Sequence, residues 1–135
     1  MFPDIIPGEK KDTPQPIRRL VFDKNWNNKL LCQKFIIIAP NNEAFVIGES
    51  LDIRIKDRFL CYTTISDKKQ LKLSEIISFG YSALDSGLEP KEFLEFMTEK
   101  YNKCKWWNGA DTEMQVVFFS KVEQLSIKYN ITNKK

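Results

Sequence analysis

The chain has 135 residues, 42% of them hydrophobic and 13% aromatic, which is enough to bury a core in one domain and excludes a wholly disordered protein. Its 21 basic and 18 acidic residues give a net charge of +3, so a nucleic-acid partner requires a local basic patch. Histidine is absent, which excludes Ser-His and Cys-His nucleophile pairs and removes the commonest metal ligand.

The cysteines and the hydropathy pattern indicate the compartment. Cys32, Cys61 and Cys104 are far apart and odd in number, which favours reduced thiols over a disulfide framework or a zinc site. No apolar run reaches the roughly 18 residues of a membrane span, and the first dozen residues lack the order of a signal peptide. We therefore expect a soluble, cytoplasmic protein.

The first third of the chain predicts an arm, a strand, a helix and a second strand. Prolines and charges in residues 1–16 predict an extended N-terminal arm, and residues 17–22 predict the first strand. A short amphipathic helix follows, with Trp26, Leu30 and Leu31 on its apolar face and Lys29 pointing elsewhere. Cys32 is expected to be a buried residue of this helix. The apolar run over residues 35–38 predicts a strand buried on both faces.

The rest of the chain predicts further strands and one long helix. Residues 51–55 alternate as a half-exposed strand, residues 59–65 form another, and residues 66–69 read as a solvated loop. Residues 71–77 predict a short helical turn, residues 85–87 a turn, and residues 89–102 a helix with Pro90 at its start and Glu92 in a reciprocal cap. The last strand begins at residue 114. We expect one α+β domain over residues 17–127 and a polar tail over residues 128–135.

Basic side chains gather around the predicted helix-to-strand junction. Lys29 and Lys34 flank this junction, and Arg18 lies on a strand that is expected nearby. Convergent cations bind a phosphate or the polar edge of a base. A solvated basic surface explains the same residues.

Aromatic and acidic residues give two further candidates. Trp106 and Trp107 precede a predicted turn, where they either stack on single-stranded bases or anchor the loop onto the core. Asp85 lies just before the long helix, where it is either a general acid or base or a turn-forming residue.

The order of these segments resembles the ASCH domains of the PUA-like superfamily over residues 17–123. The resemblance rests on K-L-L-C-Q-K-F-I-I-I, F-V-I-G-E-S-L-D-I, L-K-L-S-E-I, L-D-S-G-L-E-P-K-E-F-L-E-F-M and V-V-F-F. It implies a small PUA-like mixed β-barrel with flanking helices and a cleft suited to RNA or a modified nucleoside. Some proteins of this kind are acetylcytidine amidohydrolases that use a Lys, Thr and Glu set, and others are associated with RNA binding or ribonuclease activity.

Carried over residue by residue, the resemblance retains the lysine and loses two other groups. The family lysine matches Lys34, the threonine falls on Ile37, the arginine falls on Ala39, and the acidic position falls near Asp85 or Ser86. Isoleucine has no nucleophilic atom, and alanine binds neither an oxyanion nor a phosphate.

We therefore expect a non-enzymatic PUA-like domain that binds RNA or a nucleotide-like ligand, without a metal or cofactor. The residues expected at the site are Lys34, Lys29, Arg18, Trp106, Trp107 and Asp85. Two alternatives stay open. One is an altered nucleoside amidohydrolase or ribonuclease that uses Lys34 and Asp85, and the other is a protein-interaction module of a phage or mobile element.

Overall fold

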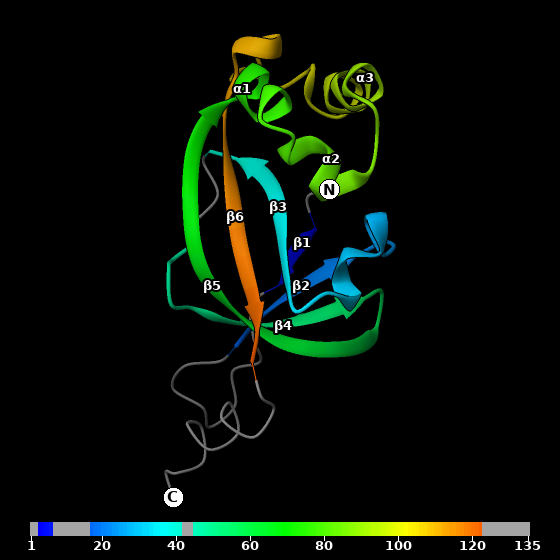
Figure 1. Ribbon diagram of the computed structural model, residues 1–135, viewed down its shortest axis with the longest axis vertical. Coiled ribbons are helices and arrows are strands. Elements are labelled where there is room, and N and C mark those ends of the chain that lie inside the picture. Colours follow the sequence, from blue (N-terminus) through cyan, green and yellow to red (C-terminus); the bar gives the residue numbers. More distant parts are fainter. Residues whose placement is uncertain (1–2, 7–16, 42–44, 123–135) are drawn as a thin grey trace, which may run out of the picture.

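The computed structural model describes residues 3–6, 17–41 and 45–122, which form a mixed α+β fold on one curled sheet (Figure 1). The strands are β1 (Asp4–Ile6), β2 (Arg18–Phe22), β3 (Lys34–Pro40), β4 (Ser50–Ile55), β5 (Arg58–Lys72) and β6 (Glu113–Lys121). The helical segments are η1 (Trp26–Leu31), α1 (Leu73–Ser78), α2 (Tyr81–Ser86), α3 (Pro90–Tyr101) and η2 (Gly109–Asp111).

The strands of the described residues form one six-stranded sheet in the order β1-β2-β4-β5-β6-β3. β2 and β4 pair in parallel, and the other neighbouring strands pair in antiparallel fashion. The sheet curls like part of a barrel, because β5 sweeps around the molecule and joins its two halves (Figure 1). This agrees with the predicted α+β sheet of closely spaced strands.

A bulge at Ser66 divides β5 into two parts that pair with different strands. Residues 58–64 pair with β4 and residues 63–72 pair with β6, with a shift of register between Ile65 and Asp67. A bulge bends a strand and increases its twist, so one long strand serves both halves of the sheet. The predicted loop over residues 66–69 is wrong. These residues continue β5, and their side chains are polar because they are exposed.

Two apolar cores lie on opposite faces of β3 and β6. In β3, Phe35, Ile37 and Ala39 face one core, and Ile36 and Ile38 face the other, which confirms the predicted strand buried on both faces. The barrel core comprises Leu20, Phe22, Leu30, Phe35, Ile37, Ala39, Phe45, Leu51, Ile53, Ile65, Val117 and Phe119. The helix-side core comprises Ile36, Ile38, Leu73, Ile76, Phe93, Met97, Tyr101, Met114 and Val116.

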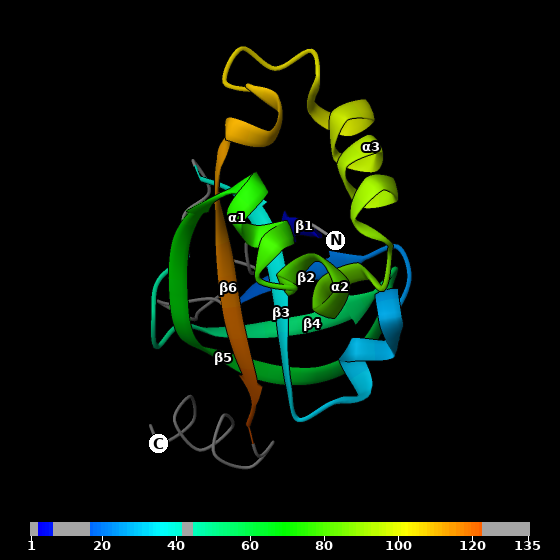
Figure 2. The same ribbon diagram turned by 45° about the horizontal axis from the view of Figure 1, so that its top comes forward.

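The three α-helices cover the helix-side core. Figure 2 shows α1 and α2 over β3 and β6, with α3 farther out. α3 begins at Pro90, and Glu89 and Glu92 form the reciprocal cap that the sequence predicted. α1 confirms the predicted helical turn. α2 corrects the predicted turn over residues 85–87, because Asp85 and Ser86 are its last residues and the turn begins at Gly87.

The segment η1 differs from the predicted amphipathic helix. Asn27 and Asn28 have φ values of 56° and 55°, which interrupt the regular helical turn. Leu31 is consequently 75% exposed, whereas Lys29 is only 4% exposed. The prediction that Leu31 packs inward and Lys29 points elsewhere is therefore wrong, and so is the prediction that Cys32 is buried, because its side chain is exposed.

The ends of the chain are described in part. Asp4–Ile6 of the predicted arm form β1, which pairs with β2, and the other residues of the arm apart from Pro3 lie outside the described residues. The predicted tail over residues 128–135 also lies outside them. Within the described ranges, each helix is too short or too polar to cross a membrane.

Candidate functional site

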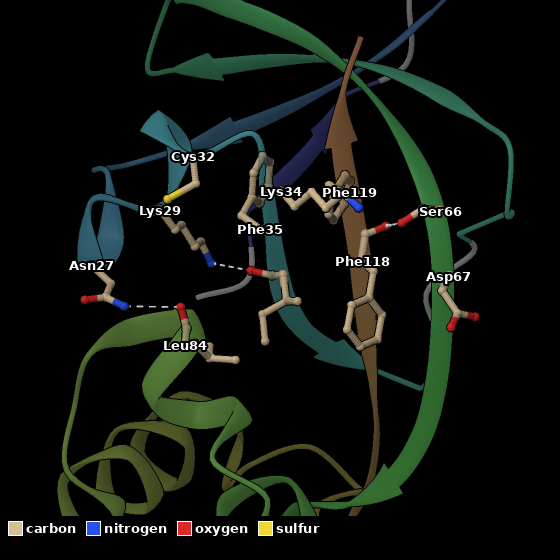
Figure 3. Close-up of a pocket in the computed structure, with 11 residues that line it drawn as sticks. Asn27, Lys29, Cys32, Lys34, Phe35, Ser66, Asp67, Leu84, Phe118 and Phe119 are labelled. Atoms are coloured by element: carbon tan, nitrogen blue, oxygen red, sulfur yellow. Dashed lines mark hydrogen bonds between the residues drawn. The ribbon is translucent and has the colours of Figure 1, made fainter.

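A pocket of about 370 Å³ lies beside the start of β3. Its wall is formed by η1, the tip of α2 and parts of β3, β5 and β6, which brings together segments far apart in the sequence (Figure 3). This volume is within the roughly 300–1,000 Å³ typical of small-molecule sites. The lining residues are Asn27, Lys29, Cys32, Lys34, Phe35, Ile36, Ser66, Asp67, Leu84, Phe118 and Phe119.

The floor of the pocket is apolar and aromatic. The rings of Phe35 and Phe119 are stacked, with centroids 5.0 Å apart and planes 11° apart, and both side chains are buried. Phe118 follows Phe119 on the same strand and so faces the other side of the sheet, where it remains half-buried. Of these three rings, only the half-buried Phe118 therefore leaves apolar surface for a flat ligand ring, and Phe35 and Phe119 support the pocket from the barrel core.

Lys29 is a buried cation in the pocket wall. Its Nζ donates a hydrogen bond of 2.8 Å to the carbonyl oxygen of Ile36 and forms an ion pair with Asp85. β3 is the last strand of the sheet, so the Ile36 carbonyl is not bonded to another strand there and the lysine satisfies it. Lys29 therefore links η1, β3 and α2, and it is not a surface donor for a ligand phosphate.

Asp85 is fully buried in α2, where it pairs with Lys29. A second contact joins the same elements. The Asn27 side-chain amide donates to the carbonyl oxygen of Ala83 at 3.1 Å and to that of Leu84 at 3.3 Å (Figure 3). Both contacts attach η1 to α2. Asp85 thus neither forms the predicted turn nor reaches the pocket wall.

Lys34 is the predicted site residue that is available to a ligand. It is exposed at the first position of β3, and its side chain extends toward β6 (Figure 3). It forms no ion pair or hydrogen bond with any residue that the structure describes. Its amino group is therefore a free cation at the edge of an aromatic pocket.

Ser66 and Asp67 supply polar groups from β5. The Ser66 hydroxyl donates to the Phe118 carbonyl oxygen at 3.3 Å, and the Asp67 carboxylate accepts from the Lys68 backbone N–H at 2.8 Å. Asp67 is exposed and retains acceptor capacity, since a carboxylate has about four lone-pair sites. The pocket thus has a cation on one side and a carboxylate on the other.

The remaining predicted site residues lie elsewhere. Arg18 pairs with Glu49 through two hydrogen bonds of 2.6 and 2.7 Å and does not line this pocket. Trp106 is 37% exposed and lines a second pocket of about 320 Å³. Trp107 packs against the helix-side core, with its ring centroid 6.2 Å from that of Tyr101. The expected set of basic and Trp side chains therefore does not converge at one place.

The two positions that the resemblance left without a reactive group are buried. Ile37 and Ala39 both have 0% exposure and belong to the barrel core. Their side chains are on the face of β3 opposite to that of Ile36. An alternation of this kind directs only every second residue of a strand to one face.

Phe118, Ser66 and Asp67 line the pocket but were missed by the sequence reasoning. One signal was present for Phe118, because the apolar run over residues 116–119 is typical of a strand buried on both faces, so consecutive phenylalanines must face opposite sides. The two β5 residues carried no signal, because a polar run before a helix resembles a loop.

The cysteines and acidic residues do not form a metal site within the described ranges. All three cysteines have free thiols. Burial raises the pKa of the Cys61 thiol, which Lys121 opposes and Asp52 reinforces by their charges. Cys32 lines the pocket and is exposed.

Comparison of the chain with protein-family models, with curated proteins and with solved structures finds no match.

Proposed function

We propose that this chain is a non-enzymatic PUA-like domain of the ASCH type. In the pocket beside β3 it binds either a free nucleotide or one nucleotide of an RNA strand. The observation that carries the proposal is the unpaired cation of Lys34 at the edge of an aromatic pocket of about 370 Å³. An apolar cavity with a few placed polar groups is the usual form of a small-molecule site.

Each part of a nucleotide has a suitable partner in this arrangement. The base contacts the apolar surfaces of Phe118 and Leu84, and its phosphate pairs with Lys34. Asp67 accepts a hydrogen bond from an exocyclic amino group, as carboxylates do from the amino group of cytosine. The proposal therefore favours bases with an amino group over uracil.

The hydrolase and ribonuclease alternatives have less support. Asp85 is fully buried and paired with Lys29, so it is not placed to transfer a proton to a ligand in the pocket. Incubation with acetylated cytidine or with a short RNA should give no product by chromatography. Turnover that disappears in Lys34→Ala would instead support an enzyme. The protein-interaction alternative has no support from a specific contact in the pocket.

Isothermal titration calorimetry of the full chain with adenosine, cytidine and uridine monophosphates tests the proposal. Binding should favour the two amino-bearing nucleotides and weaken with added salt. It should weaken roughly 10- to 150-fold in Lys34→Ala, because a charged hydrogen bond contributes roughly 1.5–3 kcal/mol.

Lys91→Ala provides the matched control, since Lys91 is an exposed lysine on α3 and does not line the pocket. It should bind as the unchanged chain does. Equal weakening in both lysine variants, or no heat of binding with any nucleotide, would contradict the proposal.

A further inference from the structure

A row of three aromatic rings leads outward from the pocket. The ring of Phe118, which lines the pocket, meets that of Tyr81 at 5.9 Å between centroids and 86° between planes. Tyr81 meets Phe79 at 6.4 Å and 88°. We call Phe118, Tyr81 and Phe79 the aromatic row.

The outer end of the aromatic row is open to solvent. Phe79 is 62% exposed, although it is a large apolar side chain at the end of α1. Gly80 lies between Phe79 and Tyr81, and a Cβ added to it would meet nothing within 4 Å. In an edge-to-face contact, the ring that presents its edge keeps both of its own faces free of the other ring. The row therefore offers ring surface along an unobstructed stretch of chain.

A second lysine lies beside the aromatic row. Lys69 Nζ is 5.8 Å from the centroid of the Phe118 ring and 3.5 Å from the Tyr81 hydroxyl oxygen. Among the described residues it has no carboxylate partner. β6 lies between β3 and β5 in the sheet, so Lys34 and Lys69 approach Phe118 from opposite neighbouring strands.

We infer that the aromatic row continues the binding site and that the ligand is a single strand of at least two nucleotides. This inference rests on the proposed function, because it takes the first base to lie in the pocket. The second base stacks on the exposed ring of Phe79, with Tyr81 between it and the pocket, and the phosphate between the two bases lies near Lys69. Aromatic rings interleaved with unpaired cations are the usual way in which proteins bind single strands. An apolar protein partner gains nothing from the two lysines.

Titration of the full chain with adenosine monophosphate and with the dinucleotide ApA tests the inference. ApA should bind roughly 5- to 150-fold more tightly than the mononucleotide, which corresponds to one stacked base. The ratio of the two affinities is the measurement that matters. Phe79→Ala should reduce this ratio to near one, and Lys69→Ala should reduce the salt dependence of ApA binding by about one phosphate contact.

Phe59→Ala is the matched control for Phe79→Ala. Phe59 is also an exposed phenylalanine, at 41%, and its ring contacts Tyr62 on β5 rather than the aromatic row. This variant should keep both affinities. An RNA duplex long enough to remain paired should not show the gain, because its bases are already stacked and paired.

The outcomes separate this inference from the proposed function. Absence of binding by every nucleotide overturns both. Lys34-dependent binding of the mononucleotide with no gain for ApA, or with a gain that persists in Phe79→Ala, overturns the inference and leaves the proposed function standing. An equal gain with duplex RNA also overturns it.

Discussion

At the scale of single residues, Lys29 shows how a charge becomes a structural element. Its ammonium group is buried between a carboxylate of α2 and a carbonyl oxygen of β3, and it lies 5.6 Å from the centroid of the Phe22 ring. Burial removes the hydration of both charges, so the pair tolerates loss of one partner much less well than loss of both. A lysine that binds only a ligand at the surface should show no such difference between the single and the double substitution.

Lys29→Ala should lower the free energy of unfolding by about 3–5 kcal/mol, because it leaves Asp85 buried without its cation. The double variant Lys29→Met with Asp85→Leu should lose less than Lys29→Ala alone. Urea denaturation followed by circular dichroism measures both values. Lys91→Ala, at an exposed site, should change stability by less than about 0.5 kcal/mol. A Lys29→Ala value as small as this would show that the ion pair contributes nothing.

At the scale of elements, α2 depends on its surroundings. It has six residues, which is too short for a helix to persist alone, and glycines with φ of +84° and +77° bound it at Gly80 and Gly87. Its position is set by the contacts of Asn27 and Lys29, both from η1. The wall of the pocket therefore depends on two elements that are not regular α-helices of ordinary length.

Gly87→Ala should destabilise the protein more than Gly80→Ala. Both substitutions place a Cβ in a left-handed conformation, at about 1–2 kcal/mol. At Gly87 the new atom would also lie 2.9 Å from Asn27 Oδ1, whereas at Gly80 it would meet open space. Thermal unfolding of the two variants measures the difference. Equal losses of thermal stability in the two variants would mean that the Asn27 side chain moves away from the new atom at no cost in stability.

Local patterns predicted the elements that carry their own signal. β3 and β6 contain continuous apolar runs, and α3 has apolar residues at helical spacing with a proline and a reciprocal cap at its start. The second half of β5 and the helix α2 carry no such signal. The polar residues 66–69 form strand because β6 pairs with them, and α2 forms between two glycines because η1 holds it. Both depend on partners distant in sequence.

The candidate site was predictable only where a residue's environment is local. Lys34 follows from its place at the start of an apolar strand, and the structure leaves it exposed as expected. The buried position of Lys29 could not be predicted without knowing that it pairs with Asp85, which lies 56 positions away. Its prediction also required the φ values of Asn27 and Asn28, which change the phase of η1 so that the usual helical spacing no longer holds.

At the scale of the whole molecule, the two cores share β3 and β6. The three tryptophans belong to one side of this arrangement, because Trp26 and Trp107 pack on the helix-side core and Trp106 contacts Tyr101. The barrel core contains none of them. Tryptophan fluorescence therefore reports the helix side alone, whereas circular dichroism reports both sides.

Ile37→Ala should lower the free energy of unfolding by about 2–5 kcal/mol, because Ile37 is fully buried in the barrel core. If the shared strands couple the cores, the urea midpoint measured by fluorescence should fall together with that measured by circular dichroism. Ile38→Ala, at the neighbouring position on the helix side, should give the same coincidence. A fluorescence midpoint that Ile37→Ala leaves unchanged would show that the cores unfold separately.

The two edges of the sheet differ in what covers them. A free strand edge invites another chain to pair with it, and such pairing leads to aggregation. β1 closes one edge with only three residues, and η1 and α2 cover the other, where the Lys29 ammonium occupies a carbonyl oxygen that a foreign strand would need. Lys29→Ala should therefore, besides weakening the fold, leave the Ile36 carbonyl oxygen free to accept a hydrogen bond from a strand of another chain.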